Sequence, residues 1–218
     1  APRGMAVLDP LEVTITNYSG PGEMLHAPWH PQQHALGSRE LPFGPKLHIE
    51  REDFMEDPPA DFKRLRPGGM VRLRYAYIIR CDDVVRDAAG AVTGLVCSYV
   101  PESKSGSDTS GLKPAGVIHW VEAGSAVPVR VRLYDRLFKV PAPSAATLAA
   151  DFDPASLAER RGWVEPAIAA SDETRFQFER LGYFCKDNVL PGVFNRTVTL
   201  RDSWKPPPAG AAAPRKGG

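Results

Sequence analysis

The feature that most constrains the fold is the stretch Val71–Ile79, in which side chains alternate in character. Apolar residues at positions 71, 73, 75 and 77 share one face of an extended chain, and Arg72 and Arg74 share the other. This period of two predicts a β-strand. Shorter stretches rich in β-branched or aromatic residues predict more strands. They are Leu11–Thr16, Leu47–Glu50, Gly94–Tyr99, Val117–Val121, Val129–Leu133, Arg175–Arg180 and Val193–Leu200.

Turn-forming residues separate the predicted strands. The 22 prolines lie mostly between strands, where they interrupt no ladder of hydrogen bonds. Ala88–Gly90 predicts a hairpin turn, and Ser103–Gly111 predicts a loop. Helices are expected to be few and short, and the candidates are Glu52–Met55, Ala60–Leu65 and Ala145–Ala150. Many short strands with regular turns indicate an all-β fold, either a barrel or a sandwich.

Composition narrows the class of protein. A chain of 218 residues with 43% hydrophobic residues suits one large globular domain or two small ones. No stretch approaches the roughly 18 apolar residues of a membrane helix, and Ala1–Asp9 has no signal-peptide pattern. Three widely spaced cysteines predict no disulfide framework or zinc ribbon, so we expect a reducing cytoplasm. A net charge of +1 excludes a bulk basic coat but allows a basic stripe.

The two ends of the chain carry separate predictions. The sequence begins at Ala1 without an initiator methionine, so we interpret it as a piece of a longer protein. Residues 205–218 are rich in Pro, Ala and Gly and predict a disordered linker or tail.

Sequence motifs for catalysis are missing. The chain has no Gly-rich phosphate loop, no G-x-S-x-G and no H-E-x-x-H. His26, His30 and His34 have helical spacing, but intervening prolines interrupt a helix, so we interpret them as loop histidines. Asp82 and Asp83 are interpreted as exposed turn residues. We therefore predict neither a catalytic nor a metal site.

Basic residues cluster in two places. The first cluster lies between residues 61 and 80 and the second between 130 and 139. Arginines two residues apart on a strand share a face, so Arg72 with Arg74 and Arg130 with Arg132 would present paired guanidinium groups. Such pairs suit phosphates and guanine edges. The alternative is a solvated strand face with surface ion pairs.

The segment Arg175–Arg180 alternates in the same way. As a strand it would bury two phenylalanines and turn Gln177 and Glu179 outward together. An amide beside a carboxylate offers donors and an acceptor to an unstacked base such as uracil. Polar pairing between neighbouring strands is the alternative and, from the residues alone, the better supported one.

Several blocks resemble, in order, the C-terminal anticodon-binding region of class I glutaminyl-tRNA synthetases of the bacterial type. The blocks are Ala1–Pro10, Asn17–Tyr18, Gly37–Arg39, Ile49–Phe54, Val71–Tyr77, Ile118–Val121, Arg132–Phe138, Phe176–Arg180 and Phe194–Trp204. They span nearly all of residues 1–204, and their order makes the resemblance specific.

The resemblance implies two β-barrels related to a ribosomal protein that binds 5S rRNA, with few short helices. It implies a proximal barrel from residues 1–25 and 125–204 and a distal barrel from 26–124. The implied partners are the anticodon loop of tRNA(Gln) and a catalytic half N-terminal to Ala1. This part of the enzyme would hold no cofactor, whereas ATP and Mg would serve the catalytic half that joins glutamine to tRNA. A cytoplasmic monomer without membrane contact is expected.

The resemblance also assigns roles to individual residues. Positions that contact the middle anticodon base, a uridine, match Arg3, Gln177 and Glu179. Positions around the third base match Lys63 and Arg64, and the first base matches Arg72. The resemblance allows Arg72 and Arg74 equally to hold phosphates, and Arg180 either to contact RNA or to fix its strand.

The sequence departs from the family pattern in two loops. Asp61 replaces an expected Gln or Lys near the third base, and Trp29 and Gln32 stand where an Asn is familiar. Two alternatives remain open from the sequence. One is a stand-alone RNA-binding barrel without a catalytic half, and the other is the same module of a glutamyl-tRNA synthetase.

Overall fold

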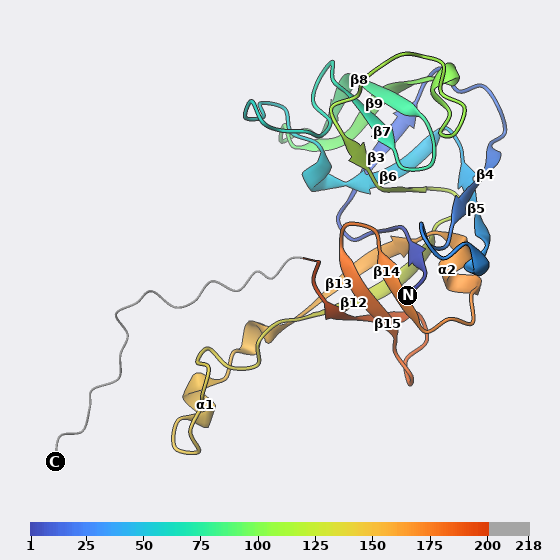
Figure 1. Ribbon diagram of the computed structural model, residues 1–218. Coiled ribbons are helices and arrows are strands. Elements are labelled where there is room, and N and C mark those ends of the chain that lie inside the picture. Colours follow the sequence, from blue (N-terminus) through green and yellow to red (C-terminus); the bar gives the residue numbers. More distant parts are fainter. Residues whose placement is uncertain (201–218) are drawn as a thin grey trace.

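The computed structural model describes residues 1–200, whose strands form two nearly closed, barrel-like sheets (Figure 1). In sheet order, the terminal barrel consists of β1 (Arg3–Gly4), β14 (Arg175–Phe178), β15 (Gly182–Lys186), β16 (Val193–Val198), β12 (Val127–Tyr134), β13 (Leu157–Val164) and β2 (Ala6–Val7). The central barrel consists of β10 (Val117–Ile118), β7 (Met70–Leu73), β8 (Ile78–Arg86), β9 (Val92–Val100), β3 (Pro10–Ile15), β6 (Lys46–Glu50) and β11 (Trp120–Glu122). The predicted all-β class with two barrels is confirmed.

Each barrel is closed by one short stretch of chain that supplies both edges of its sheet. Only Met5 separates β1 from β2, although these strands lie at opposite ends of the strand order. In the central barrel, only His119 separates β10 from β11. In both barrels the first half of the stretch pairs in parallel, with β14 or β7, and the second half pairs antiparallel, with β13 or β6. This closure leaves no long unpaired edge.

The two barrels repeat one topology. Their strands pair in the same sequence of parallel and antiparallel neighbours, so β7 corresponds to β14 and β10 to β1. The closing stretch comes first along the chain in the terminal barrel and last in the central barrel, which relates the barrels by circular permutation. The backbone hydrogen bonds repeat at 2.9 Å, from Gln177 to Pro2 and Arg72 to Gly116, and from Glu179 to Gly4 and Arg74 to Ile118.

A tight turn follows β7 and β14 at corresponding positions. Tyr75 has a φ of 65° and Arg180 a φ of 69°, the left-handed conformation that the third residue of a type II turn requires. The strands predicted over Val71–Ile79 and Arg175–Arg180 were therefore wrong in extent. The first breaks after Leu73, and the second ends at Phe178.

A separate core fills each barrel. Four phenylalanines dominate the terminal barrel, and the rings of Phe178 and Phe184 stack with centroids 4.4 Å apart. The central barrel buries aliphatic side chains around Trp120 and Phe43, whose rings meet edge to face at 5.5 Å. Of the inward residues that the period of two predicted, four are fully buried, namely Val71, Leu73, Phe176 and Phe178.

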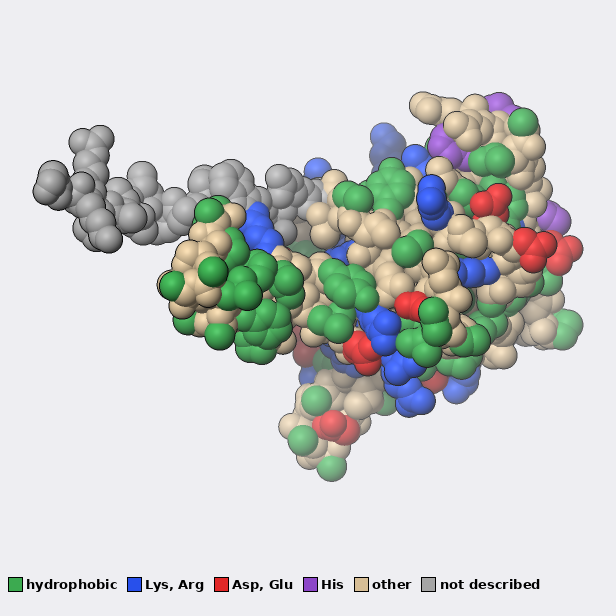
Figure 2. Space-filling model, turned by 90° about the horizontal axis from the view of Figure 1, so that it is seen from below, with side chains coloured by type: hydrophobic (Ala, Val, Ile, Leu, Met, Phe, Trp, Pro, Cys, Tyr) green, Lys and Arg blue, Asp and Glu red, His purple; other side chains and the backbone are tan. Residues whose placement is uncertain are grey.

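Two extensions leave the barrels. The hairpin of β4 (Glu23–Pro28) and β5 (Ser38–Phe43) runs beside both barrels and contacts α2 (Pro166–Ala170) (Figure 1). An arm of residues 135–156, which includes α1 (Leu148–Asp151) and η4 (Pro154–Ser156), projects from the terminal barrel (Figure 1). Hydrophobic side chains cover the arm, seen at the left of Figure 2. Within residues 1–200, no helix is long and apolar enough to cross a membrane.

The short helices match the predictions only in part. The predicted helices at 52–55 and 145–150 overlap η2 (Arg51–Asp53) and α1, and the turn at Ala88–Gly90 joins β8 to β9 as predicted. The helix predicted at Ala60–Leu65 was wrong, because the chain there makes one turn and then a bridge from Leu65 to Phe54. The sequence did not reveal α2, nor η1 (His34–Leu36) or η3 (Pro101–Ser103).

The predicted division into a proximal and a distal barrel stays a prediction. Strand pairing joins residues 3–7 to the terminal barrel, whereas β3, within the predicted segment 1–25, pairs with β6 and β9 of the central barrel. The change from one sheet to the other therefore falls between Val7 and Pro10. The tail predicted at 205–218 lies outside the described residues.

Candidate nucleic-acid interface

The turns after β7 and β14 meet where the two barrels pack together. Arg74 and Glu179 occupy corresponding positions of the repeat and face one another, with Arg74 Nε 3.6 Å from Glu179 Oε2. Tyr75 donates its hydroxyl to Glu179 Oε1 at 2.7 Å. Burial and the Glu179 carboxylate raise the pKa of Tyr75, so the phenol keeps the proton that it donates. We call this junction of the two turns the crease.

A second polar contact, which we call the clasp, joins the barrels beside the crease. Asp53 is fully buried and accepts hydrogen bonds from both terminal nitrogens of Arg180 at 2.6 Å and from Arg64 Nη1. Arg180 also lies 3.2 Å from Nδ1 of His119, the residue that breaks the closing stretch of the central barrel. Burial raises the pKa of Asp53, and Arg180 opposes this shift. The clasp satisfies a buried carboxylate with two guanidinium groups.

Arg3 and Gln177 lie side by side at the edge of the crease. They are register partners across the parallel pair of β1 and β14, and both are partly exposed. Arg3 Nε is buried, yet it has no hydrogen-bond partner among the described residues, and the same holds for Arg74 Nε. A buried donor without an acceptor costs free energy. Arg74 Nε still faces the Glu179 carboxylate at 3.6 Å, so Arg3 Nε is the donor of this pair that has no acidic partner among residues 1–200.

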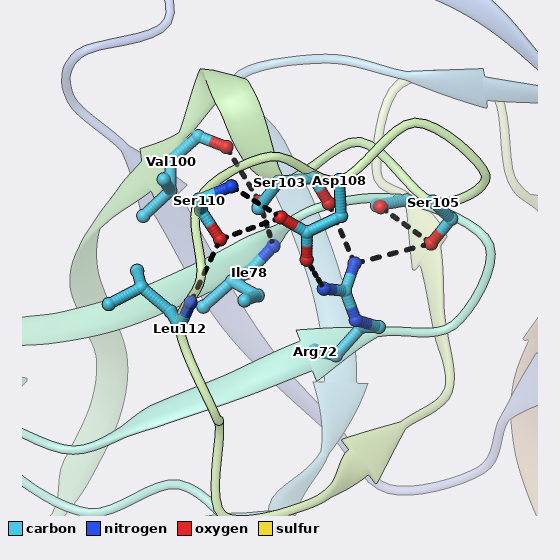
Figure 3. Close-up of polar contacts among 9 residues, drawn as sticks. Arg72, Ile78, Val100, Ser103, Ser105, Asp108, Ser110 and Leu112 are labelled. Carbon is cyan, nitrogen blue, oxygen red and sulfur yellow. Dashed lines mark hydrogen bonds and ion pairs between the residues drawn. The ribbon is translucent and has the colours of Figure 1, made fainter.

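Three other predicted residues belong to the central barrel: Arg72 lies on β7, and Lys63 and Arg64 lie on the connection between β6 and β7. Lys63 is exposed and makes no described polar contact through its ammonium group. Arg64 belongs to the clasp, with its side chain 37% exposed. Arg72 does not pair with Arg74, because its guanidinium turns to the 103–110 loop and contacts Ser103, Ser105 and Asp108 (Figure 3).

The predicted orientation of Glu179 was wrong. The sequence pattern turned Glu179 outward with Gln177, but Glu179 is only 3% exposed and is held by Tyr75 and Arg74. The physical reason is that β14 ends at Phe178, so the alternation stops before Glu179. Gln177 is the only member of that pair at the surface. For Arg180, the structure supports the interpretation that it fixes its strand, through Asp53.

Three residues that the sequence did not single out shape the interface. They are Tyr75, which bonds Glu179, Asp53, which holds the clasp, and Arg39, which is buried against Glu165. Arg39 also lies over the rings of Trp29 and Tyr75, at 5.1 and 5.6 Å from their centroids. Alternation gave no signal for them, because each partner lies in a distant segment. Among residues 1–200, no group of acidic, histidine and cysteine side chains is arranged to hold a metal ion.

Tyr75→Phe is expected to destabilise the protein by about 1–3 kcal/mol, because it removes the donor to a buried carboxylate. Urea unfolding of the variant measures this loss. Tyr134→Phe is the matched control, since the Tyr134 hydroxyl bonds Asn195 at 3.2 Å on an exposed strand end. Equal stability of both variants would show that Tyr75 does not hold Glu179.

Family models agree with this architecture. Two models described as the anticodon-binding domain of class I tRNA synthetases (E and Q) match residues 1–100 and 117–187. The chain belongs to this family. The first match covers the hairpin and most of the central barrel, and the second begins at β10 and includes most of the terminal barrel. The crease forms between segments from both matches.

Three curated relatives are glutamine–tRNA ligases. The chain is 50% identical over 209 residues to the enzyme of Nitrobacter hamburgensis, and 52% identical over 213 and 215 residues to those of Rhodopirellula baltica and Pseudomonas putida. Each match covers 94% of this chain but only 38%, 35% and 38% of the relatives. The chain therefore spans little more than a third of these ligases and corresponds to their anticodon-binding part.

Proposed function

We propose that this chain recognises the anticodon loop of tRNA(Gln) at the crease between its barrels. Arg3 and Gln177 contact the middle uridine, with Glu179 behind them holding Arg74 and Tyr75 in place. Lys63 and Arg64 contact the third base, and Arg72 contacts the first base or its phosphate. Three glutamine–tRNA ligases about half identical to the chain support the choice of tRNA.

The whole protein, in this proposal, is an ATP-dependent ligase that joins glutamine to tRNA(Gln). Its catalytic half precedes Ala1 and uses ATP and Mg, and the chain described here supplies recognition. The enzyme works in the cytoplasm as a monomer. The partial coverage of the relatives supports this division of labour, because the chain matches only about a third of each ligase.

One observation carries the proposal: Arg3 and Gln177 are register partners at the edge of the crease, both are partly exposed, and Arg3 Nε has no hydrogen-bond partner among residues 1–200. Uracil presents two carbonyl acceptors flanking an N–H donor. The Arg3 donor and the Gln177 amide, which both donates and accepts, match that edge. The Arg3 guanidinium would gain an acceptor when the base binds.

Gln177→Ala tests this assignment. Good base contacts are worth about 1–3 kcal/mol, so we expect about 5- to 150-fold weaker binding of tRNA(Gln). A tRNA(Gln) transcript with cytidine in place of the middle uridine should lose much less. Fluorescence anisotropy with both transcripts measures the two losses.

Arg175→Ala is the matched control for this experiment. Arg175 lies two residues earlier on the same face of β14, so it tests a general loss of charge near the crease. It should weaken both transcripts to the same modest degree. Parallel losses for both variants on both transcripts would contradict a base-specific role for Gln177.

A further inference from the structure

The guanidinium of Arg72 is occupied by the loop that follows η3 (Figure 3). Its Nη1 donates to the Ser103 carbonyl at 2.7 Å and to Ser105 Oγ at 3.4 Å. Its Nη2 donates to a carboxylate oxygen of Asp108. A residue expected to contact RNA is thus already bound to an acid of its own chain.

The Asp108 carboxylate is held toward Arg72 by its own loop. Its other oxygen, Oδ1, accepts hydrogen bonds from the backbone of Ser110 at 2.8 Å and from the Ser110 hydroxyl at 2.7 Å. These bonds and the neighbouring Arg72 lower the pKa of Asp108, so the carboxylate stays charged. The loop therefore presents a fixed anion to the guanidinium, as an RNA phosphate would.

Arg72 does not need Asp108 to stay in place. Its Nη1 contacts are neutral oxygens, and Ser103 is fully buried, with its hydroxyl bonded to Val100 at 2.6 Å and to Ile78 at 2.7 Å. The Ser103 carbonyl is thus a rigid anchor for the guanidinium. Asp108 differs, because its side chain is 27% exposed and lies on a surface loop. Its contact with Arg72 can be exchanged without disturbing the core.

We propose that Asp108 is an internal competitor that occupies Arg72 when RNA is absent and yields to an RNA phosphate when the anticodon loop binds. The inference rests on the proposed function and adds a residue that sets affinity at the same site. An acid that must be displaced weakens binding of every RNA that uses Arg72, so only RNAs with further contacts at the crease remain bound.

Asp108→Asn tests the proposal. Asparagine keeps an oxygen for the Ser110 bonds but removes the charge that competes for Arg72. Because a partly exposed ion pair contributes little free energy, we expect about two- to five-fold tighter binding of an RNA hairpin whose loop carries the triplet CUG. Asp82→Asn is the matched control, since Asp82 pairs with Arg80 on the same barrel and is 28% exposed.

A double-mutant comparison ties the effect to Arg72. In an Arg72→Ala background, Asp108→Asn should gain no more affinity than Asp82→Asn, because the competitor has nothing to release. Weaker binding by Asp108→Asn would overturn the proposal and make Asp108 a positioning residue. A gain equal to that of Asp82→Asn would also overturn it, because a general change in net charge would then explain the tighter binding. If the unmodified chain binds the CUG hairpin no better than a hairpin with a scrambled loop, the proposed function itself fails.

Discussion

Asp53→Asn is expected to destabilise the protein by about 3–5 kcal/mol, the usual cost of breaking a buried ion pair by removing one partner. Asp53 is fully buried and accepts from Arg180 and Arg64, and an amide in its place would direct donors or a weak acceptor toward them. The clasp joins the turn after β14 to the central barrel, so its loss should also loosen the two barrels from each other. Urea unfolding measures the change in free energy and reports whether one transition becomes two.

Asp61→Asn is the control for the clasp. Asp61 is an exposed aspartate in the same connection between β6 and β7, and surface substitutions of this kind are usually within about 0.5 kcal/mol of neutral. Reduced affinity for tRNA should accompany the Asp53 loss, since Arg180 follows directly after Glu179 at the crease. A variant as stable as Asp61→Asn would show that Arg180 and Arg64 are satisfied without Asp53.

Much of the fold could be predicted from the sequence, because alternation of apolar residues is a local property. Each of the eight predicted strand segments overlaps at least one observed strand, and the apolar residues at positions 71 and 73 are buried as their alternation requires. It could not show that residues 3–7 and 117–122 each close a barrel. Residues 3–7 are too short for a periodic signal, and the strand predicted at Val117–Val121 has partners that lie far away in the chain.

The ends of β7 and β14 explain why the site was only partly predicted. The turns place Tyr75 and Arg180 in a left-handed conformation that glycine usually adopts. Because neither residue is a glycine, the sequence contained no signal for these turns. The alternation therefore predicted strands that were several residues too long, and it predicted that Glu179 faces outward. Arg72 and Arg74 were predicted to act as a pair, but Arg74 lies in the turn and Arg72 lies before it. Arg72 contacts Asp108, and Arg74 contacts Glu179.

Because the two barrels repeat one topology, the site residues of one barrel occupy the same structural positions as those of the other. Arg72 and Gln177 correspond to one another, and so do Arg74 and Glu179, with Arg3 beside Gln177 as Val117 is beside Arg72. Two copies of one strand-and-turn unit thus face each other with opposite charges. The sequence shows no internal repeat, because the barrels share backbone pairing rather than side chains.

Arg39→Met is expected to make stability strongly dependent on pH above neutrality. Arg39 and Glu165 are both about 1% exposed and form an ion pair that links β5 to the start of α2. Burial raises the pKa of Glu165 from 4.5 to about 7, and Arg39 opposes this shift. Removing Arg39 should raise that pKa further, because a buried carboxylate without a cation prefers to be neutral.

The sign follows from the protons bound in each state. Between the unfolded and the folded pKa of Glu165, the folded protein holds a proton that the unfolded chain has released, so stability falls as pH rises. Unmodified protein loses this contribution up to about pH 7 and then levels off, whereas Arg39→Met continues to lose about 1.4 kcal/mol per pH unit. Urea unfolding from about pH 5 to pH 9 measures the widening gap. In Arg39→Met with Glu165→Gln the extra slope should vanish, since the amide does not titrate. A slope that persists there would place the titrating group elsewhere.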